Sequence, residues 1–107
     1  MSNRIRVQRR AVEDIDEIAG FIRRRSEQNA RRFVACAYGA IAGLTDLPEA
    51  NRLLAPGDPE LGAVRCGRIT RHPNHLVLHR IEGETIRVLR VVDAKRRDLT
   101  AGLRAGR

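Results

Sequence analysis

The sequence predicts an α+β fold in which a helical hairpin packs on a largely antiparallel four-stranded sheet. Three observations support it: an alternating apolar pattern at the amino end, two successive amphipathic helical patterns, and three strand-like runs in the second half. The expected element order is β-α-α-β-β-β. With 107 residues, 42% of them hydrophobic, the chain has the size of one domain, which we expect to span residues 1–107.

The amino end combines a short strand with the first helix. Ile5 and Val7 alternate with polar residues, which is typical of a strand with one apolar face. From Arg9 onward the apolar residues recur instead at steps of three and four, as in a helix. They are Val12, Ile15, Ile18, Ala19 and Ile22. Acidic residues on the early turns and arginines at 23–25 complement the helix dipole, so this pattern predicts a helix.

A second helix is predicted to follow after a few residues. Ser26 or Asn29 can cap its start, because both side chains accept hydrogen bonds from free backbone N–H groups. The apolar stripe of this helix consists of Phe33, Val34, Ala37, Ile41 and Leu44. Pro48 cannot continue a helix and disfavours helical geometry in the residue before it, which makes Leu47 the expected last position. Two neighbouring helices with one apolar side each indicate a hairpin that covers a sheet.

The second half of the chain contains the remaining strands. Residues 48–63 are rich in proline and glycine and are expected to form a connector with little regular structure. Strands are predicted at 64–69, 75–81 and 85–92, and the short turn at 82–84 makes the last two a hairpin. The final strand is almost continuously apolar, which favours a position buried on both faces.

Charge is concentrated toward the carboxyl end. The chain carries 21 basic and 13 acidic residues, a formal charge of +8, and Lys95 is the only lysine. Residues 64–107 hold 11 of the bases and 4 of the acids. Arginine grips carboxylate or phosphate groups in two places, so this region favours an acidic partner. The basic tail, residues 94–107, has too few apolar residues for us to expect that the core requires it.

The composition excludes several classes of protein and site. No run of about 18 or more apolar residues and no signal peptide is present, so we expect a cytoplasmic protein without a membrane partner. Cys36 and Cys66 have no cysteine nearby, and we expect them to be reduced. His72 and His75 lie across a turn, and no cysteine or acid is spaced to complete a zinc site. We therefore expect neither a metal nor a cofactor.

Short motifs in a fixed order link this chain to a known family. They are Arg9-Arg10-Ala11 and Asp14-Ile15 in the first helix, Leu44 and Pro48 at the end of the second, the runs 75–80 and 86–92, and Arg96-Arg97-Asp98-Leu99 in the tail. In this order they resemble the ParE branch of the RelE/ParE superfamily of bacterial toxins, which are also known as plasmid stabilisation proteins. The chain departs from that pattern at Asp93, where such sequences often carry histidine, and by one additional residue before Asp98.

The resemblance implies a toxin that is held inactive by a ParD-like antitoxin encoded beside it. ParE-like members act on DNA gyrase, so the implied activity is inhibition of gyrase through protein binding, with no catalysis by the toxin. Basic residues of the strands and tail are the expected target-binding set. They are Arg65, Arg68, Arg80, Arg90, Lys95, Arg96 and Arg97. The sequence does not indicate which residues contact the antitoxin.

The main alternative is the RelE branch, whose members cleave messenger RNA on the ribosome. Aligned with that branch, its strand arginine falls on Leu76 and its late tyrosine falls near Ala101, and neither side chain can do the chemistry. The single tyrosine, Tyr38, lies in the second helical pattern. His72, His75 and His79 could replace the lost groups, because histidine titrates near neutral pH. Half-buried strand histidines are more often structural, and we expect none of the three to be catalytic.

A further alternative is a basic module that binds nucleic acid without catalysis. The arginines could contact phosphates, and such binding would weaken steeply with salt. Aromatic residues make up only 3% of the chain, however, which leaves few rings on which bases could stack. We therefore favour the toxin.

Overall fold

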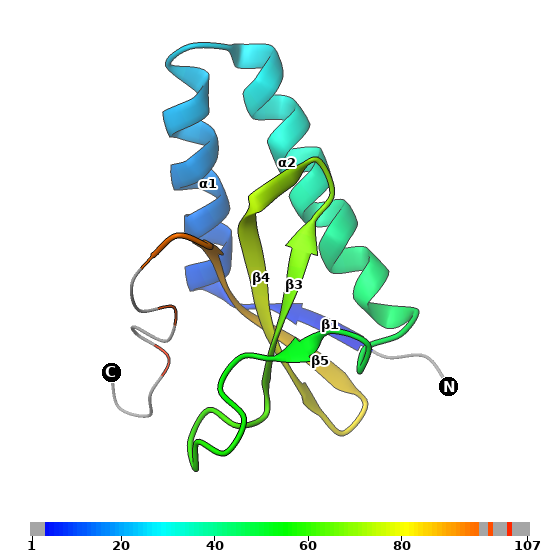
Figure 1. The fold of residues 1–107 in the computed structure, drawn as a ribbon. Helices are drawn as coiled ribbons and strands as arrows, with labels where there is room; N and C mark the ends of the chain where they lie inside the picture. Colours follow the sequence, from blue (N-terminus) through cyan, green and yellow to red (C-terminus); the bar gives the residue numbers. More distant parts are fainter. Residues whose placement is uncertain (1–3, 97–98, 100–102, 104–107) are drawn as a thin grey trace.

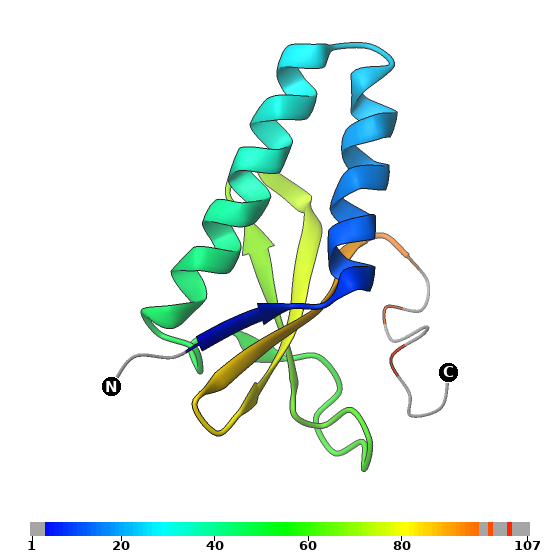
Figure 2. The same ribbon diagram turned by 180° about the vertical axis from the view of Figure 1, so that it is seen from behind.

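The computed structural model describes residues 4–96, 99 and 103 and has the α+β architecture that the sequence predicts (Figure 1). Its elements are β1 (Arg4–Val7), α1 (Arg9–Arg23), α2 (Glu27–Ala42), the 3₁₀ helix η1 (Gly43–Thr45), β2 (Arg52–Leu53), β3 (Val64–Ile69), β4 (His72–Glu82) and β5 (Thr85–Asp93). Both helices lie on the same face of the sheet, as Figures 1 and 2 show from opposite sides.

The sheet has five strands in the order β1-β5-β4-β3-β2. Strand β1 runs parallel to β5 and the other pairs are antiparallel, so the prediction of a largely antiparallel sheet is confirmed. The prediction of four strands is wrong, because the connector contributes β2, where Arg52 and Leu53 pair with Cys66 and Arg65. A strand of two residues has no alternation of its own, and the pairing with β3 defines it.

The second helix begins as the sequence predicts and ends earlier. The Ser26 Oγ accepts a hydrogen bond from the backbone N–H of Asn29 at 3.1 Å, which makes Ser26 the N-cap. The helix ends at Ala42, five residues before the predicted Leu47, and tightens into η1. This tightening buries Leu44 against the sheet.

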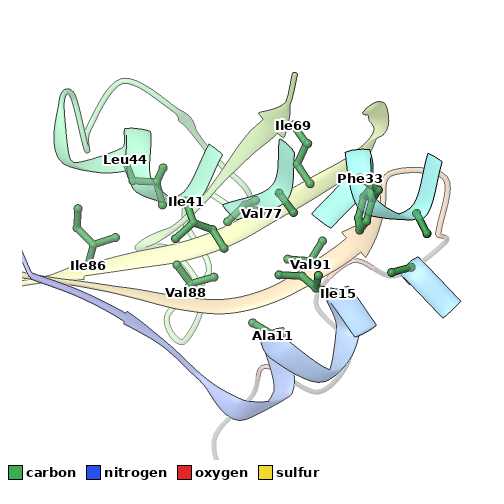
Figure 3. Packing of buried hydrophobic residues seen from close by; sticks show 13 residues of the cluster. Ala11, Ile15, Phe33, Ile41, Leu44, Ile69, Val77, Ile86, Val88 and Val91 are labelled. Carbon is green, nitrogen blue, oxygen red and sulfur yellow. The ribbon is translucent and has the colours of Figure 1, made fainter. Parts of the chain in front are cut away.

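The first core cluster lies between the helices and the sheet (Figure 3). Ala11 and Ile15 of α1 and Phe33 and Ile41 of α2 pack on the strands, and all are nearly inaccessible to solvent. From the sheet they meet Ile69, Val77, Ile86, Val88 and Val91. Since one buried Leu, Ile or Phe contributes about 1.5 to 3 kcal/mol, this layer is a major source of stability.

A second core cluster covers the opposite face of the sheet. Its buried members are Leu61, Val64, Cys66, Leu76, Leu78, Leu89 and Val92. The prediction that the last strand is buried on both faces is confirmed, because β5 contributes Val88 to the first cluster and Leu89 to the second. Successive strand residues point to opposite faces, and a β-bulge shifts the alternation: Leu78 pairs with Arg90 and His79 with Val88, so Leu89 is the additional residue and Val91 joins Val88 in the first cluster.

Three described residues of the tail contact this second cluster, and whether the core requires the tail stays a prediction. Leu99 and Leu103 are partly buried and pack against the cluster, as does Ala94.

We expect Leu99→Ala to lower the free energy of unfolding by about 1 kcal/mol, because the substitution removes most of a branched apolar side chain from its contact with the cluster. Chemical denaturation measures this change. Leu47→Ala is the matched control, since Leu47 is 71% exposed and should change stability little; equal losses in both variants would contradict a packed tail.

Candidate functional site

The sheet face opposite the helices carries unpaired arginines above the second core cluster. Directly opposed residues of an antiparallel pair share a face. Arg52 opposes Cys66 and Arg68 opposes Leu76, and both apolar partners belong to the second cluster. Arg52 and Arg68 therefore project on this face. Both are exposed, and neither forms an ion pair with any of the described residues.

A cavity of about 600 Å³ lies between these two arginines. Asn51 contributes the remaining polar side chain, and the tail closes one side with Leu99. The apolar wall includes Cys66 and Leu76 from the sheet. Within the described part of the chain, no histidine, tyrosine or carboxylate lines this cavity. It can therefore hold an anionic group, but its described lining offers no general base or acid.

Two further arginines extend the same face toward the β4–β5 turn. Arg80 opposes Arg87 across the strands, and Glu82 lies between them. The Arg87 Nε is 3.0 Å from Glu82 Oε1, and the Arg80 Nη1 is 3.6 Å from Glu82 Oε2. One carboxylate thus faces two guanidinium groups and leaves a net positive charge. We call Arg52, Arg68, Arg80 and Arg87 together the basic sheet face.

Only part of the set of target-binding residues expected from the sequence lies on this face. Arg68 and Arg80 belong to it, whereas Lys95 is exposed beside the outer surface of α1. Arg65 instead donates hydrogen bonds to the backbone oxygens of Glu49 at 3.1 Å and Asn51 at 2.8 Å, which holds the connector on the sheet. Arg96 is exposed, and Arg97 lies outside the described residues.

Arg90, which the sequence groups with the target-binding arginines, lies in the interior instead. Its side chain is 7% exposed and faces Asp14 of α1, which is 4% exposed. The Arg90 Nε donates to Asp14 Oδ2 at 2.7 Å and the Nη2 donates to Oδ1 at 3.1 Å. The Val91 N–H also donates to Oδ2, at 2.9 Å, and the Arg10 Nη1 lies 3.2 Å from Oδ1. Arg90 therefore joins α1 to β5 in the interior of the molecule.

The three histidines lie away from the cavity on the basic sheet face. The rings of His72 and His75 pack edge-on against Phe33 of α2, with centroids 5.1 and 5.2 Å away. His79 is fully buried, and its Nε2 is 3.5 Å from the backbone oxygen of Pro48. Burial lowers the pKa of His79 and also that of His75, where the charge of Asp93 partly opposes the effect. These positions support structural roles.

The buried His79 predicts a pH dependence of stability. Its pKa is lower in the folded protein than the ordinary 6.5, so the unfolded chain binds more protons as the pH falls below that value. The free energy of unfolding should therefore decrease from pH 7.5 to pH 5.5. Thermal melts at both pH values should show a smaller decrease for His79→Gln, with His72→Gln as control. An equal decrease in all three proteins would contradict a titrating His79.

An apolar groove lies on the other side of the sheet, between α2 and the β3 edge. Its volume is about 500 Å³, and its lining includes Gly39, Leu44 and Val77. Leu47, 71% exposed, stands at this groove. Strand β2 pairs only with Arg65 and Cys66, so the outer edge of β3 from Gly67 onward has no strand partner in the described part of the chain. Such a combination suits an apolar segment of another protein.

Comparison with known proteins identifies the family. A model of the ParE toxin of type II toxin-antitoxin systems, parDE, matches residues 5–98. The chain belongs to the ParE toxin family. It is thus a type II toxin of the ParE/RelE superfamily, as the motif order at the two helices and last strands indicated.

Solved structures share the fold of this ParE-family toxin. A chain from the chromosomal ParDE toxin-antitoxin system of P. aeruginosa is similar with a TM-score of 0.70 and 21% identity, over 86% of this chain and 96% of that one. A chain of the toxin-antitoxin complex RelBE2 from Mycobacterium tuberculosis is similar with a TM-score of 0.60 and 21% identity, over 87% and 99% of the two chains. No curated protein matches the sequence.

The described part of this toxin offers neither a membrane-spanning helix nor a cluster of metal ligands. No described helix has the length and apolar character needed to cross a bilayer. No group of three or more histidine, cysteine, aspartate or glutamate side chains in the described ranges is arranged to hold a metal ion.

The sequence alone did not assign Arg52 or Arg87 to the site of this toxin. Arg52 reaches the basic sheet face only because β2 pairs with β3, and no local pattern predicts that pairing. For Arg87, the usable signal was its place opposite Arg80 in the predicted hairpin.

Proposed function

We propose that this toxin inhibits DNA gyrase by binding it in the cytoplasm, without hydrolytic chemistry of its own. The observation that carries the proposal is the lining of the cavity on the basic sheet face. It offers Arg52 and Arg68 but no described histidine, tyrosine or carboxylate. Cleavage of RNA would require a group that removes the 2′-hydroxyl proton and one that protonates the leaving oxygen. The family supports gyrase as the target.

We also propose a ParD-like antitoxin as the neutralising partner. Both similar structures come from toxin-antitoxin systems, and the apolar groove beside α2 offers a surface that an amphipathic segment of such a partner would cover. The net charge of +8 favours an acidic partner and accelerates its association. Phe21, which is 70% exposed on α1, offers a second apolar contact.

A gyrase supercoiling assay tests the proposal. Purified toxin should inhibit supercoiling of relaxed plasmid, and equimolar antitoxin from the neighbouring gene should restore it. The same preparation should leave messenger RNA intact in a translation reaction with ribosomes. Cleaved messenger RNA with unaffected supercoiling would overturn the proposal and select the RelE-like ribonuclease, whereas direct binding to free RNA alone would select the nucleic-acid-binding module.

A further inference from the structure

A third pocket lies on the helix side of the molecule, away from the basic sheet face and next to the apolar groove, with which it shares Cys36. It has a volume of about 540 Å³ and is formed where the β3–β4 turn meets α2 and the end of α1. Figures 1 and 2 show this turn beside the first half of α2. Its lining combines the apolar residues Ile22 and Ala35 with the cations Arg32 and Arg71, and is completed by Asn29, Cys36 and His72.

Neither Arg32 nor Arg71 forms an ion pair with an acidic side chain in the described part of the chain. On the same helices, Arg23 and Arg31 both form ion pairs with Glu27. Arg32 follows Arg31 directly but turns to the pocket, and neither it nor Arg71 pairs with a carboxylate of the described residues. No described acidic residue lines this pocket. The pocket therefore has a positive charge that the described chain leaves uncompensated.

Arg71 has a backbone conformation that is unusual for a residue with a side chain. Thr70 and Arg71 form a two-residue turn between the paired residues Ile69 and His72. Arg71 has a φ of 70°, the only positive φ of a non-glycine residue in the described ranges. Glycine or asparagine is favoured at such a turn position, because a Cβ atom carries a steric cost there. An arginine kept at this cost indicates a function for its side chain.

His72 holds the turn in place. Its ring lies edge-on to the ring of Phe33, with the planes at 88° and the centroids 5.1 Å apart. Phe33 is fully buried in the first core cluster. The turn that presents Arg71 is thus seated on the core, so its backbone needs little reorganisation to receive a ligand.

We propose that this pocket binds an acidic side chain of the antitoxin, with its carboxylate between Arg32 and Arg71. The proposal rests on the toxin-antitoxin function above and adds a specific contact to it. The planar fork of arginine matches a carboxylate with two parallel hydrogen bonds. The apolar lining residues Ile22 and Ala35 can contact the methylene groups of the acidic side chain, or an apolar residue next to it in the antitoxin. Nucleic acid fits less well, because the lining has no aromatic ring besides the imidazole of His72.

The variant Arg71→Gly separates a binding role from a structural one. Glycine adopts a φ of 70° without strain, so the melting temperature of the free toxin should stay equal or rise. Its affinity for the antitoxin should nevertheless fall at least about tenfold, because a charge-assisted pair is lost. Arg32→Gln should weaken binding similarly. Arg31→Gln is the matched control, since Arg31 lies on the same helix, is exposed and does not line the pocket.

The affinity of each toxin variant for the purified antitoxin encoded beside the toxin gene is measured by calorimetric titration, at low and at high salt. The loss in both pocket variants should shrink at high salt, where exposed charges are screened. Wild-type affinity in Arg71→Gly and Arg32→Gln would overturn the pocket while leaving the proposed function intact. Failure of the wild-type toxin to bind the antitoxin would overturn both. Reduced binding of single-stranded RNA with unchanged binding of antitoxin would also overturn the assignment.

Discussion

Replacing Asp14 by alanine is expected to lower the free energy of unfolding by about 3 to 5 kcal/mol, because it breaks a buried ion pair. The buried carboxylate accepts hydrogen bonds from the Nε and Nη2 of Arg90 and from the Val91 N–H. Without it, the guanidinium of Arg90 stays buried and loses its opposing charge. That cost exceeds the loss of the hydrogen bonds themselves.

Urea denaturation measures this change, and three further variants help to interpret it. Asp16→Ala removes an exposed carboxylate of the same helix and should alter stability by less than about 0.5 kcal/mol. The double variant Asp14→Leu with Arg90→Leu should recover much of the loss, because both charges are removed together. If Asp14→Ala does not fold, Asp14→Asn, which retains an acceptor for the Val91 N–H, should show a smaller loss. A loss below about 1 kcal/mol in Asp14→Ala would contradict the role of the pair.

Local patterns in the sequence predicted the order of elements but not this pair. The helical spacing around Ile15 and the almost continuous apolar run at 86–92 correctly indicate α1 and β5. Asp14 and Arg90, however, look like an exposed helix acid and a strand cation, because nothing within a few residues of either shows its partner. Their contact spans 76 positions of the chain. Such a pair depends on tertiary packing, which hydrophobic periodicity does not encode.

The sequence predicted only part of the candidate site, and the reason is again that tertiary structure decides where each side chain lies. Arg68 and Arg80, which the sequence groups with the target-binding residues, both lie on the basic sheet face, but the face on which an arginine lies depends on register. The bulge at Leu89 changes the face along β5, and the pairing with β2 brings Arg52 beside Arg68. Arg65 was expected to bind the target, yet its side chain donates hydrogen bonds to the backbone oxygens of Glu49 and Asn51. The sequence shows the excess of positive charge, but only the strand pairing of the sheet shows on which face, or in which contact, each cation lies.

Reversing two charges on the basic sheet face should abolish growth inhibition by the toxin. The double variant Arg52→Glu with Arg68→Glu changes both cations at the cavity from positive to negative, which turns attraction to an acidic target surface into repulsion. We expect the concentration that inhibits gyrase supercoiling to rise at least about 100-fold, since truncating or reversing central charges of an interface commonly costs several kcal/mol. Both side chains are exposed, so the melting temperature should change little.

A matched variant shows whether position or net charge is responsible. Arg4→Glu with Arg6→Glu makes the same change in charge at two exposed positions of β1, the strand at the opposite edge of the sheet. It should retain most of the inhibition, because its arginines lie far along the sheet from the cavity between β2 and β3. Equal loss in both double variants would mean that the toxin needs only its overall positive field. Retained inhibition in Arg52→Glu with Arg68→Glu would instead move the target-binding surface away from the basic sheet face, toward the exposed cations Lys95 and Arg96 beyond β5.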